Sequence, residues 1–138
     1  MRRILILSGS ALPRRTRTEW CERFLSLEAL EPGWESVWRT LMETKPDWDG
    51  FAKHMHPRET EYEQLLVYFL LRHFLADGGR DAAARAGFAV LSTAMLYALG
   101  AARFTASGGF SPADAQELVR LYSANIEYSE DNMRKILE

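Results

Sequence analysis

Cysteine is almost absent from the sequence, and this scarcity excludes several classes of protein. Cys21 is the single cysteine among 138 residues. One thiol cannot close an internal disulfide, and it cannot supply a four-cysteine zinc or iron–sulfur site. A disulfide-stabilised scaffold and a self-contained cysteine metal centre are therefore excluded for this chain alone.

Excess charge and long apolar runs are missing as well. The net charge is −2, so no overall basic character indicates nucleic acid as a partner. The longest uncharged stretch, Ala86 to Ala102, would span about 25 Å as a helix, less than the roughly 30 Å hydrocarbon core of a bilayer. The apolar run Ile4 to Leu7 is too short for a signal peptide. We expect a cytoplasmic protein with neither nucleic acid nor a membrane among its partners.

The size and hydrophobic pattern predict one helical domain. Apolar residues make up 47% of the chain and aromatic residues 12%, which is typical of a soluble globular protein. Strand-like alternation is missing after residue 10, and the apolar residues recur at helical intervals. We predict an all-α bundle of about five or six helices over residues 16–138, preceded by a basic arm or frayed helix over 1–15.

Local signals place most of the helix boundaries. Thr16 and Glu19 have the spacing of a capping box, and Ser111 with Asp114 repeats it ahead of another helix. Pro32 is expected in the first turn of a helix that carries a tryptophan-rich stripe. The segment 45–57 is predicted to be a loop with at most one short helical turn. Ser129 can re-cap the end of the chain, so one bent helix or two short ones remain open.

Two long helices are expected at the centre of the bundle. They cover about residues 59–75 and 80–104, and both are apolar on nearly every side. A helix that is apolar all round is usually buried, so we predict that both helices are central.

Several short motifs point to chemistry only weakly. The segment from Ile4 to Ser10 is similar to a first strand and phosphate loop, but a flavin-binding reductase needs further parallel strands that the rest of the sequence lacks. The pair His54 and His56 has no third ligand at a recognisable spacing, which favours surface-loop histidines over a metal site. His73 is interpreted as a packed histidine rather than a catalytic base. The arginines of the first 17 residues are interpreted as a solvated face.

The densest polar segment lies near the C-terminus, between residues 121 and 132. Tyr122, Asn125 and Ser129 are expected beside an apolar stripe, where polar groups need partners. A functional polar site explains such a segment about as well as helix capping and surface solvation do, so both interpretations stay open.

This polar segment and two others resemble the C-terminal region of the flagellin lysine-N-methylase family. The first is Leu121-Tyr122-Ser123 followed by Ile126-Glu127-Tyr128-Ser129-Glu130-Asp131-Asn132. The others are Gln64-Leu65-Leu66-Val67-Tyr68-Phe69 and Glu31-Pro32-Gly33-Trp34. The sequence departs from the family where Tyr128 replaces histidine, Asp131 replaces glutamate and Gln64-Leu65 replaces Asn-Tyr.

The resemblance implies a part in methyl transfer from S-adenosylmethionine to a protein lysine, with flagellin as the substrate. It also implies an N-terminal cysteine cluster with an iron–sulfur centre in full-length relatives, and this chain lacks those cysteines. We therefore expect the chain to bind neither cofactor alone, to be inactive alone, and to have flagellin or a cysteine-rich segment as its partner.

The candidate site residues follow from the same resemblance. Glu127 is expected to accept a proton or to bind the lysine ammonium, because a lysine must be neutral to attack a methyl group. The catalytic candidates are Glu127, Tyr122, Ser129 and Asn132. The candidates for substrate binding are Tyr68 and Arg72, and no metal ligand is predicted. The alternative function is a noncatalytic module that binds a partner or forms a homodimer.

Overall fold

The computed structural model describes residues 15–73, 78–79 and 81–137, and in these ranges the chain is helical without a β-strand. This confirms the predicted all-α class. The elements, in chain order, are α2 (Arg17–Leu25), α3 (Trp34–Glu43), α4 (Trp48–Met55), the 3₁₀ helix η1 (His56–Arg58), α5 (Glu59–His73), α6 (Ala82–Ser107), α7 (Pro112–Tyr122), the π-helix η2 (Ser123–Glu127) and α8 (Glu130–Leu137).

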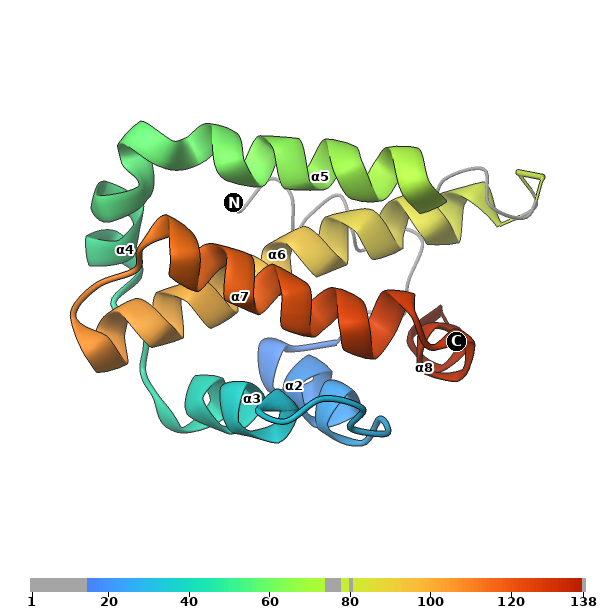
Figure 1. The fold of residues 1–138 in the computed structure, drawn as a ribbon, viewed down its shortest axis with the longest axis horizontal. Helices are drawn as coiled ribbons and strands as arrows, with labels where there is room; N and C mark the ends of the chain where they lie inside the picture. The colour runs from blue at the N-terminus through green and yellow to red at the C-terminus, as the bar shows by residue number, and fades with distance from the viewer. Residues whose placement is uncertain (1–14, 74–77, 80, 138) are drawn as a thin grey trace.

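Helix α6 forms the centre of the bundle. It contacts α3, α4, α5, α7 and α8, and Figure 1 shows α5 along one side of it and the pair α2 and α3 on the opposite side. By length and composition α6 could cross a membrane, but 67% of its most apolar window is buried inside the protein. The small side chains of α6 allow its neighbours to approach closely, so it serves as the core helix that the sequence predicted.

Aromatic side chains fix α2 and α3 to the C-terminal half of the chain. Phe24 and Trp38 are stacked with their ring centroids 4.5 Å apart, and Tyr122 lies 5.8 Å from the same phenylalanine. The Trp34 indole donates a hydrogen bond of 3.1 Å to the Phe24 carbonyl, which satisfies a polar group inside the core.

The boundaries at Thr16 and Ser111 are confirmed, whereas two others differ from the prediction. The Thr16 hydroxyl accepts from the Glu19 amide at 3.1 Å, and Ser111 with Asp114 forms a complete capping box. Helix α3 begins after Pro32, at Trp34, because Gly33 precedes it with a φ of 93°. A left-handed residue cannot continue a right-handed helix, so the proline stays in the preceding loop.

The segment predicted as a loop contains helix α4. The Asp47 carboxylate caps it by accepting from the Gly50 amide at 3.0 Å, and Phe51 is fully buried against the aromatic residues of α6. Met55 is also buried, and the Trp48 ring stacks on that of Tyr97 in α6. The helix thus depends on its cap and on aromatic contacts with α6, which come from a distant part of the sequence.

The prediction that α5 is buried on every side was wrong. Only Phe69 and His73 of this helix are buried, whereas the side chain of Leu71 is 82% exposed and that of Val67 is 52% exposed. The reason is that α6 packs along one face of α5 and leaves the opposite face to solvent (Figure 1). The predicted arm over residues 1–15, together with the Ile4–Ser10 motif, lies outside the described residues except for Arg15.

Candidate functional site

A π-helical turn separates α7 from α8 and places the polar residues of the C-terminal segment. In η2 the Tyr128 amide donates to the Ser123 carbonyl at 3.2 Å, five residues earlier in the chain. Such a turn inserts one extra residue and changes the direction of the side chains that follow it. The Ser129 hydroxyl then accepts from the Asn132 amide at 3.1 Å, so the open question is settled in favour of two helices joined by a π-turn.

The last residue of η2 is a buried carboxylate that bridges to α5. The side chain of Glu127 is 1% exposed, and four side chains donate to it. Its Oε2 atom accepts from Arg72 Nε at 2.6 Å, His73 Nε2 at 2.9 Å and the Tyr68 hydroxyl at 3.0 Å. Its Oε1 atom accepts from the Ser123 hydroxyl at 2.7 Å. We refer to these five residues as the Glu127 cluster.

The surroundings of Glu127 keep it ionised. Burial acts to raise the pKa of the Glu127 carboxyl, but hydrogen bonds from His73, Ser123 and Tyr68 outweigh burial, and the pKa lies below its ordinary value. A general base works best when its pKa is near the working pH. The carboxylate is therefore better suited to holding a cation than to abstracting a proton.

Arg72 and Tyr128 form the outer side of the Glu127 cluster. The Arg72 side chain is 42% exposed, and its guanidinium carbon lies 5.8 Å from the centroid of the Tyr128 ring. Tyr128 is itself 74% exposed. The guanidinium thus links a buried carboxylate to an aromatic face that is open to solvent.

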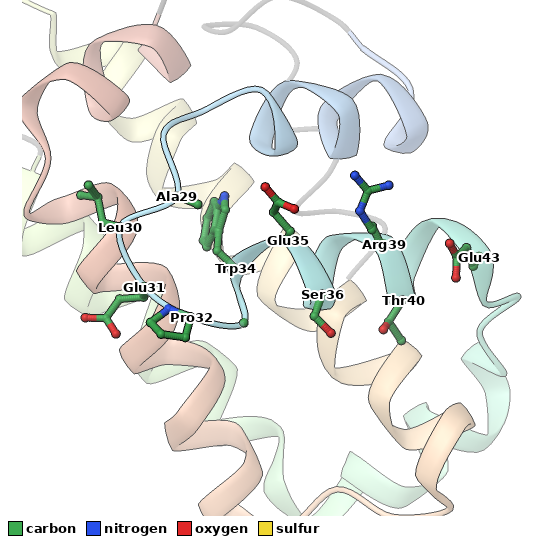
Figure 2. A pocket seen from close by; sticks show the side chains of 11 residues that line it. Ala29, Leu30, Glu31, Pro32, Trp34, Glu35, Ser36, Arg39, Thr40 and Glu43 are labelled. Atoms are coloured by element: carbon green, nitrogen blue, oxygen red, sulfur yellow. The ribbon is translucent and has the colours of Figure 1, made fainter.

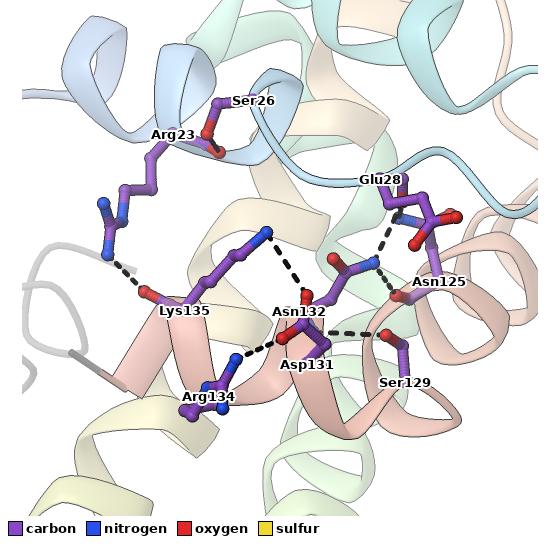
Figure 3. A network of polar contacts seen from close by, with 9 residues as sticks. All are labelled: Arg23, Ser26, Glu28, Asn125, Ser129, Asp131, Asn132, Arg134 and Lys135. Atoms are coloured by element: carbon purple, nitrogen blue, oxygen red, sulfur yellow. Dashed lines mark hydrogen bonds and ion pairs between the residues drawn. The ribbon is translucent and has the colours of Figure 1, made fainter.

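The C-terminal segment also bonds to the loop between α2 and α3, on a second set of contacts (Figure 3). The Asn132 side-chain amide donates to the carbonyls of Glu28 and Asn125, each at 2.9 Å. The Asn125 side chain accepts from the Leu30 amide at 2.6 Å and donates to the Glu28 carbonyl at 3.1 Å. Both asparagines are fully buried. Their side chains therefore satisfy backbone groups of an irregular loop that would otherwise need hydrogen bonds from water.

Tyr122 lies apart from both networks, in the aromatic core. Its hydroxyl is 2.7 Å from the Ser92 hydroxyl of α6, and burial raises the pKa of the phenol above its ordinary range. The residue is 1% exposed, and its ring packs between those of Phe24 and Phe69.

The predicted site residues consequently occupy three places. Glu127, Tyr68 and Arg72 meet in one cluster, Tyr122 faces the core, and Ser129 with Asn132 organises the start of α8. The sequence reasoning missed His73 and Ser123 as members of the Glu127 cluster. Ser123 lies four residues before Glu127, which is a detectable helical spacing, whereas His73 is brought in only by the packing of α5.

Two grooves lie away from these residues. The larger, of about 830 Å³, follows the α2–α3 loop and α3, and Figure 2 shows Glu35 and Arg39 on one side of α3 with Ser36 and Thr40 on the other. The smaller, of about 340 Å³, lies beside Cys21 and Trp48. None of the candidate site residues lines either groove.

His54 and His56 lie in two different helices and contact different partners. His54 belongs to α4 rather than to a loop, and its Nε2 atom is 3.0 Å from the Phe110 carbonyl. His56 lies in η1, 3.5 Å from Glu59. Within the ranges that the structure describes, no three His, Cys, Asp or Glu side chains are grouped as metal ligands.

Fold and site together define a class, namely an all-α domain whose C-terminal polar segment is bonded both to a neighbouring helix and to an N-terminal loop. The family described as FliB lysine N-methylase C-terminal domain matches residues 18–138, and the chain belongs to this family. No curated protein matches the chain, and no solved structure matches it.

Proposed function

We propose that this chain is the helical domain that supports S-adenosylmethionine-dependent methylation of a protein lysine, with flagellin as the substrate. On this proposal the domain binds the substrate protein and does not transfer the methyl group alone. S-adenosylmethionine and the iron–sulfur centre belong to a cysteine-rich partner segment, and the two meet in the cytoplasm. The membership of residues 18–138 in the lysine N-methylase C-terminal family supports the link to this reaction.

One structural observation carries the proposal, because the three segments that resemble the family contact one another. The segment with Gln64 to Phe69 reaches the C-terminal segment through Tyr68 and Glu127. The segment Glu31-Pro32-Gly33-Trp34 reaches it through Trp34, whose ring centroid lies 6.2 Å from that of Tyr122. The C-terminal segment thus joins both of the others, and we propose that its exposed part, beside Arg72 and Tyr128, is the binding surface.

The chemistry of the Glu127 cluster supports substrate binding rather than methyl transfer. Its carboxylate is ionised and its pKa is lowered, which makes it a weak proton acceptor at neutral pH but leaves its negative charge in place. A carboxylate of this kind attracts an ammonium group. We therefore favour the binding of lysine over proton abstraction as the role of Glu127.

A methylation assay tests the proposal. Flagellin and S-adenosylmethionine are incubated with the chain alone, with a cysteine-rich partner segment alone, and with both, and methyl-lysine is measured by mass spectrometry. We expect methylation with both components and little with either alone. If the folded chain adds nothing to the partner segment, the proposal is wrong.

The exposed apolar face of α5 favours a second candidate, a noncatalytic module that binds a partner or forms a homodimer. Leu71 and Val67 lie one helical turn apart on this face, and both are more than half exposed. Exposed apolar side chains that adjoin one another often mark interaction sites. Light scattering of the purified chain separates a homodimer from a monomer, and a monomer that binds no hydrophobic dye would rule this candidate out.

A further inference from the structure

We propose that the space beside Glu127, which the Arg72 guanidinium now fills, is a binding site for an alkylammonium group. Arg72 is then an internal cation that the side chain of a lysine or methyl-lysine displaces. The identity of the ligand as a lysine of a protein substrate rests on the proposed function. The existence of a cation site at this position rests on the geometry of the cluster alone.

Arg72 and Tyr68 are the most exposed members of the Glu127 cluster. His73 is 8% exposed and Ser123 donates to the other carboxylate oxygen, Oε1, whereas Arg72 is 42% exposed and Tyr68 is 41% exposed. Arg72 and Tyr68 thus form the wall between Glu127 and solvent. If the arginine side chain turns outward, the carboxylate is reached directly from the surface while its two inner donors stay in place.

The negative charge of Glu127 restricts which groups can replace Arg72. A buried carboxylate that loses its counter-charge is strongly destabilised, so a neutral group cannot take the place of Arg72. An incoming ammonium conserves the net charge of the site, and the exchange of one cation for another leaves Glu127 paired throughout. The chemistry of the site therefore selects a cation over any neutral polar group.

The surface around the site is aromatic and apolar. The Tyr68 hydroxyl and the Arg72 guanidinium donate to the same carboxylate oxygen, and the Tyr128 ring lies 5.8 Å from the guanidinium carbon. Alkylammonium and methylammonium groups bind favourably to aromatic faces. Leu71 and Val67 adjoin the site along α5 and are exposed, which fits a lysine whose neighbours in the substrate are apolar. The ligand class is thus a lysine in an apolar segment.

The test compares short peptides and uses the chain as it is. Two probe peptides are used, namely Leu-Ala-Lys-Ala-Leu with blocked ends and the same peptide with trimethyl-lysine. The control peptide carries acetyl-lysine, whose side chain has no charge. Binding is measured by titration calorimetry on the unaltered chain and on Arg72→Ala, Tyr128→Ala and Arg120→Ala. Arg120 pairs with Glu117 and Glu31, away from the Glu127 cluster, so its variant removes an arginine without opening the site.

The proposal predicts an increase in affinity on removal of a side chain. Arg72→Ala should bind the lysine peptides at least tenfold more tightly than the unaltered chain, because the internal competitor is gone. The acetyl-lysine peptide should bind at least tenfold more weakly than the lysine peptide, both to the unaltered chain and to Arg72→Ala. Tyr128→Ala should lower the affinity for trimethyl-lysine about fivefold, and Arg120→Ala should change nothing.

A second measurement covers the case in which Arg72→Ala folds poorly. Its melting temperature is followed against methylammonium and methylguanidinium chloride, with sodium chloride at equal ionic strength as the control. The proposal predicts a rise with the organic cations alone. It is overturned if a folded variant shows no such rise, or if the unaltered chain binds lysine and acetyl-lysine peptides equally. Neither measurement involves methylation, so failure of the methylation assay with intact cation binding would refute the proposed function and leave the site standing.

Discussion

Replacing Asn132 by alanine should destabilise the domain strongly, since this side chain is a junction between the two ends of the fold. It is fully buried and donates to the carbonyls of Glu28 and Asn125. The Glu28 carbonyl keeps a second donor in the Asn125 side chain, but the Asn125 carbonyl loses the bond from Asn132. Two lost hydrogen bonds at about 1 kcal/mol each, plus a buried carbonyl left with one donor fewer, give about 2–4 kcal/mol.

Equilibrium unfolding in urea measures this loss, with the fluorescence of the four tryptophans as the signal. The matched control is Asp131→Ala, whose side chain is 50% exposed and pairs with Arg134 and Lys135 on the surface (Figure 3). The control should stay within about 0.5 kcal/mol of the unaltered chain. If Asn132→Ala unfolds at the same urea concentration as the control, the asparagine junction does not hold the loop, and the structural role assigned to it is wrong.

Three further predictions concern the Glu127 carboxyl, a close helix contact and the lone thiol. Folding lowers the pKa of the Glu127 carboxyl below its ordinary value of 4.5. The ionised carboxylate therefore contributes fully to stability above pH 4.5, and this contribution is lost as the pH falls through the lowered pKa. Glu127→Gln should therefore flatten the acid limb of the stability curve, and an unchanged limb in urea titrations below pH 4.5 would contradict the assignment. In Gly100→Ala the new methyl group would lie 2.8 Å from the Tyr62 hydroxyl and 3.0 Å from the Phe51 ring, so thermal unfolding should show a loss of about 1–3 kcal/mol, whereas Gly109→Ala, with open space around it, should show little. The Cys21 thiol is 1% exposed and burial raises its pKa to about 11, so maleimide at pH 8 should label it only in urea; rapid labelling of the folded chain would show that the α2–α3 contact opens.

The sequence was most informative where a local chemical rule decides the structure. The cap residues Thr16 and Ser111 act on amides three residues away, and a short-range bond of that kind depends little on the rest of the fold. The same holds for α6, whose small and apolar residues suit a central helix in any bundle.

The sequence was least informative where the partner of a residue comes from elsewhere in the chain. An apolar pattern on every side of α5 does not tell which face receives α6, and so Leu71 was expected inside the protein although it is exposed. His73 enters the Glu127 cluster only because α5 ends beside the π-turn. The π-turn itself leaves no local signal, and it separates Glu127 from Asn132, which the sequence had grouped into one site.

A double-mutant cycle tests most directly whether Arg72 is the counter-charge of the buried Glu127 carboxylate. Arg72→Ala, Glu127→Gln and the double variant are unfolded in urea, and the coupling energy is obtained from the three differences in free energy. We expect a favourable coupling of about 1–2 kcal/mol, below that of a fully buried pair because the arginine is 42% exposed. Effects that add to within about 0.3 kcal/mol would contradict it, since Arg72 would then not be the counter-charge of the buried carboxylate.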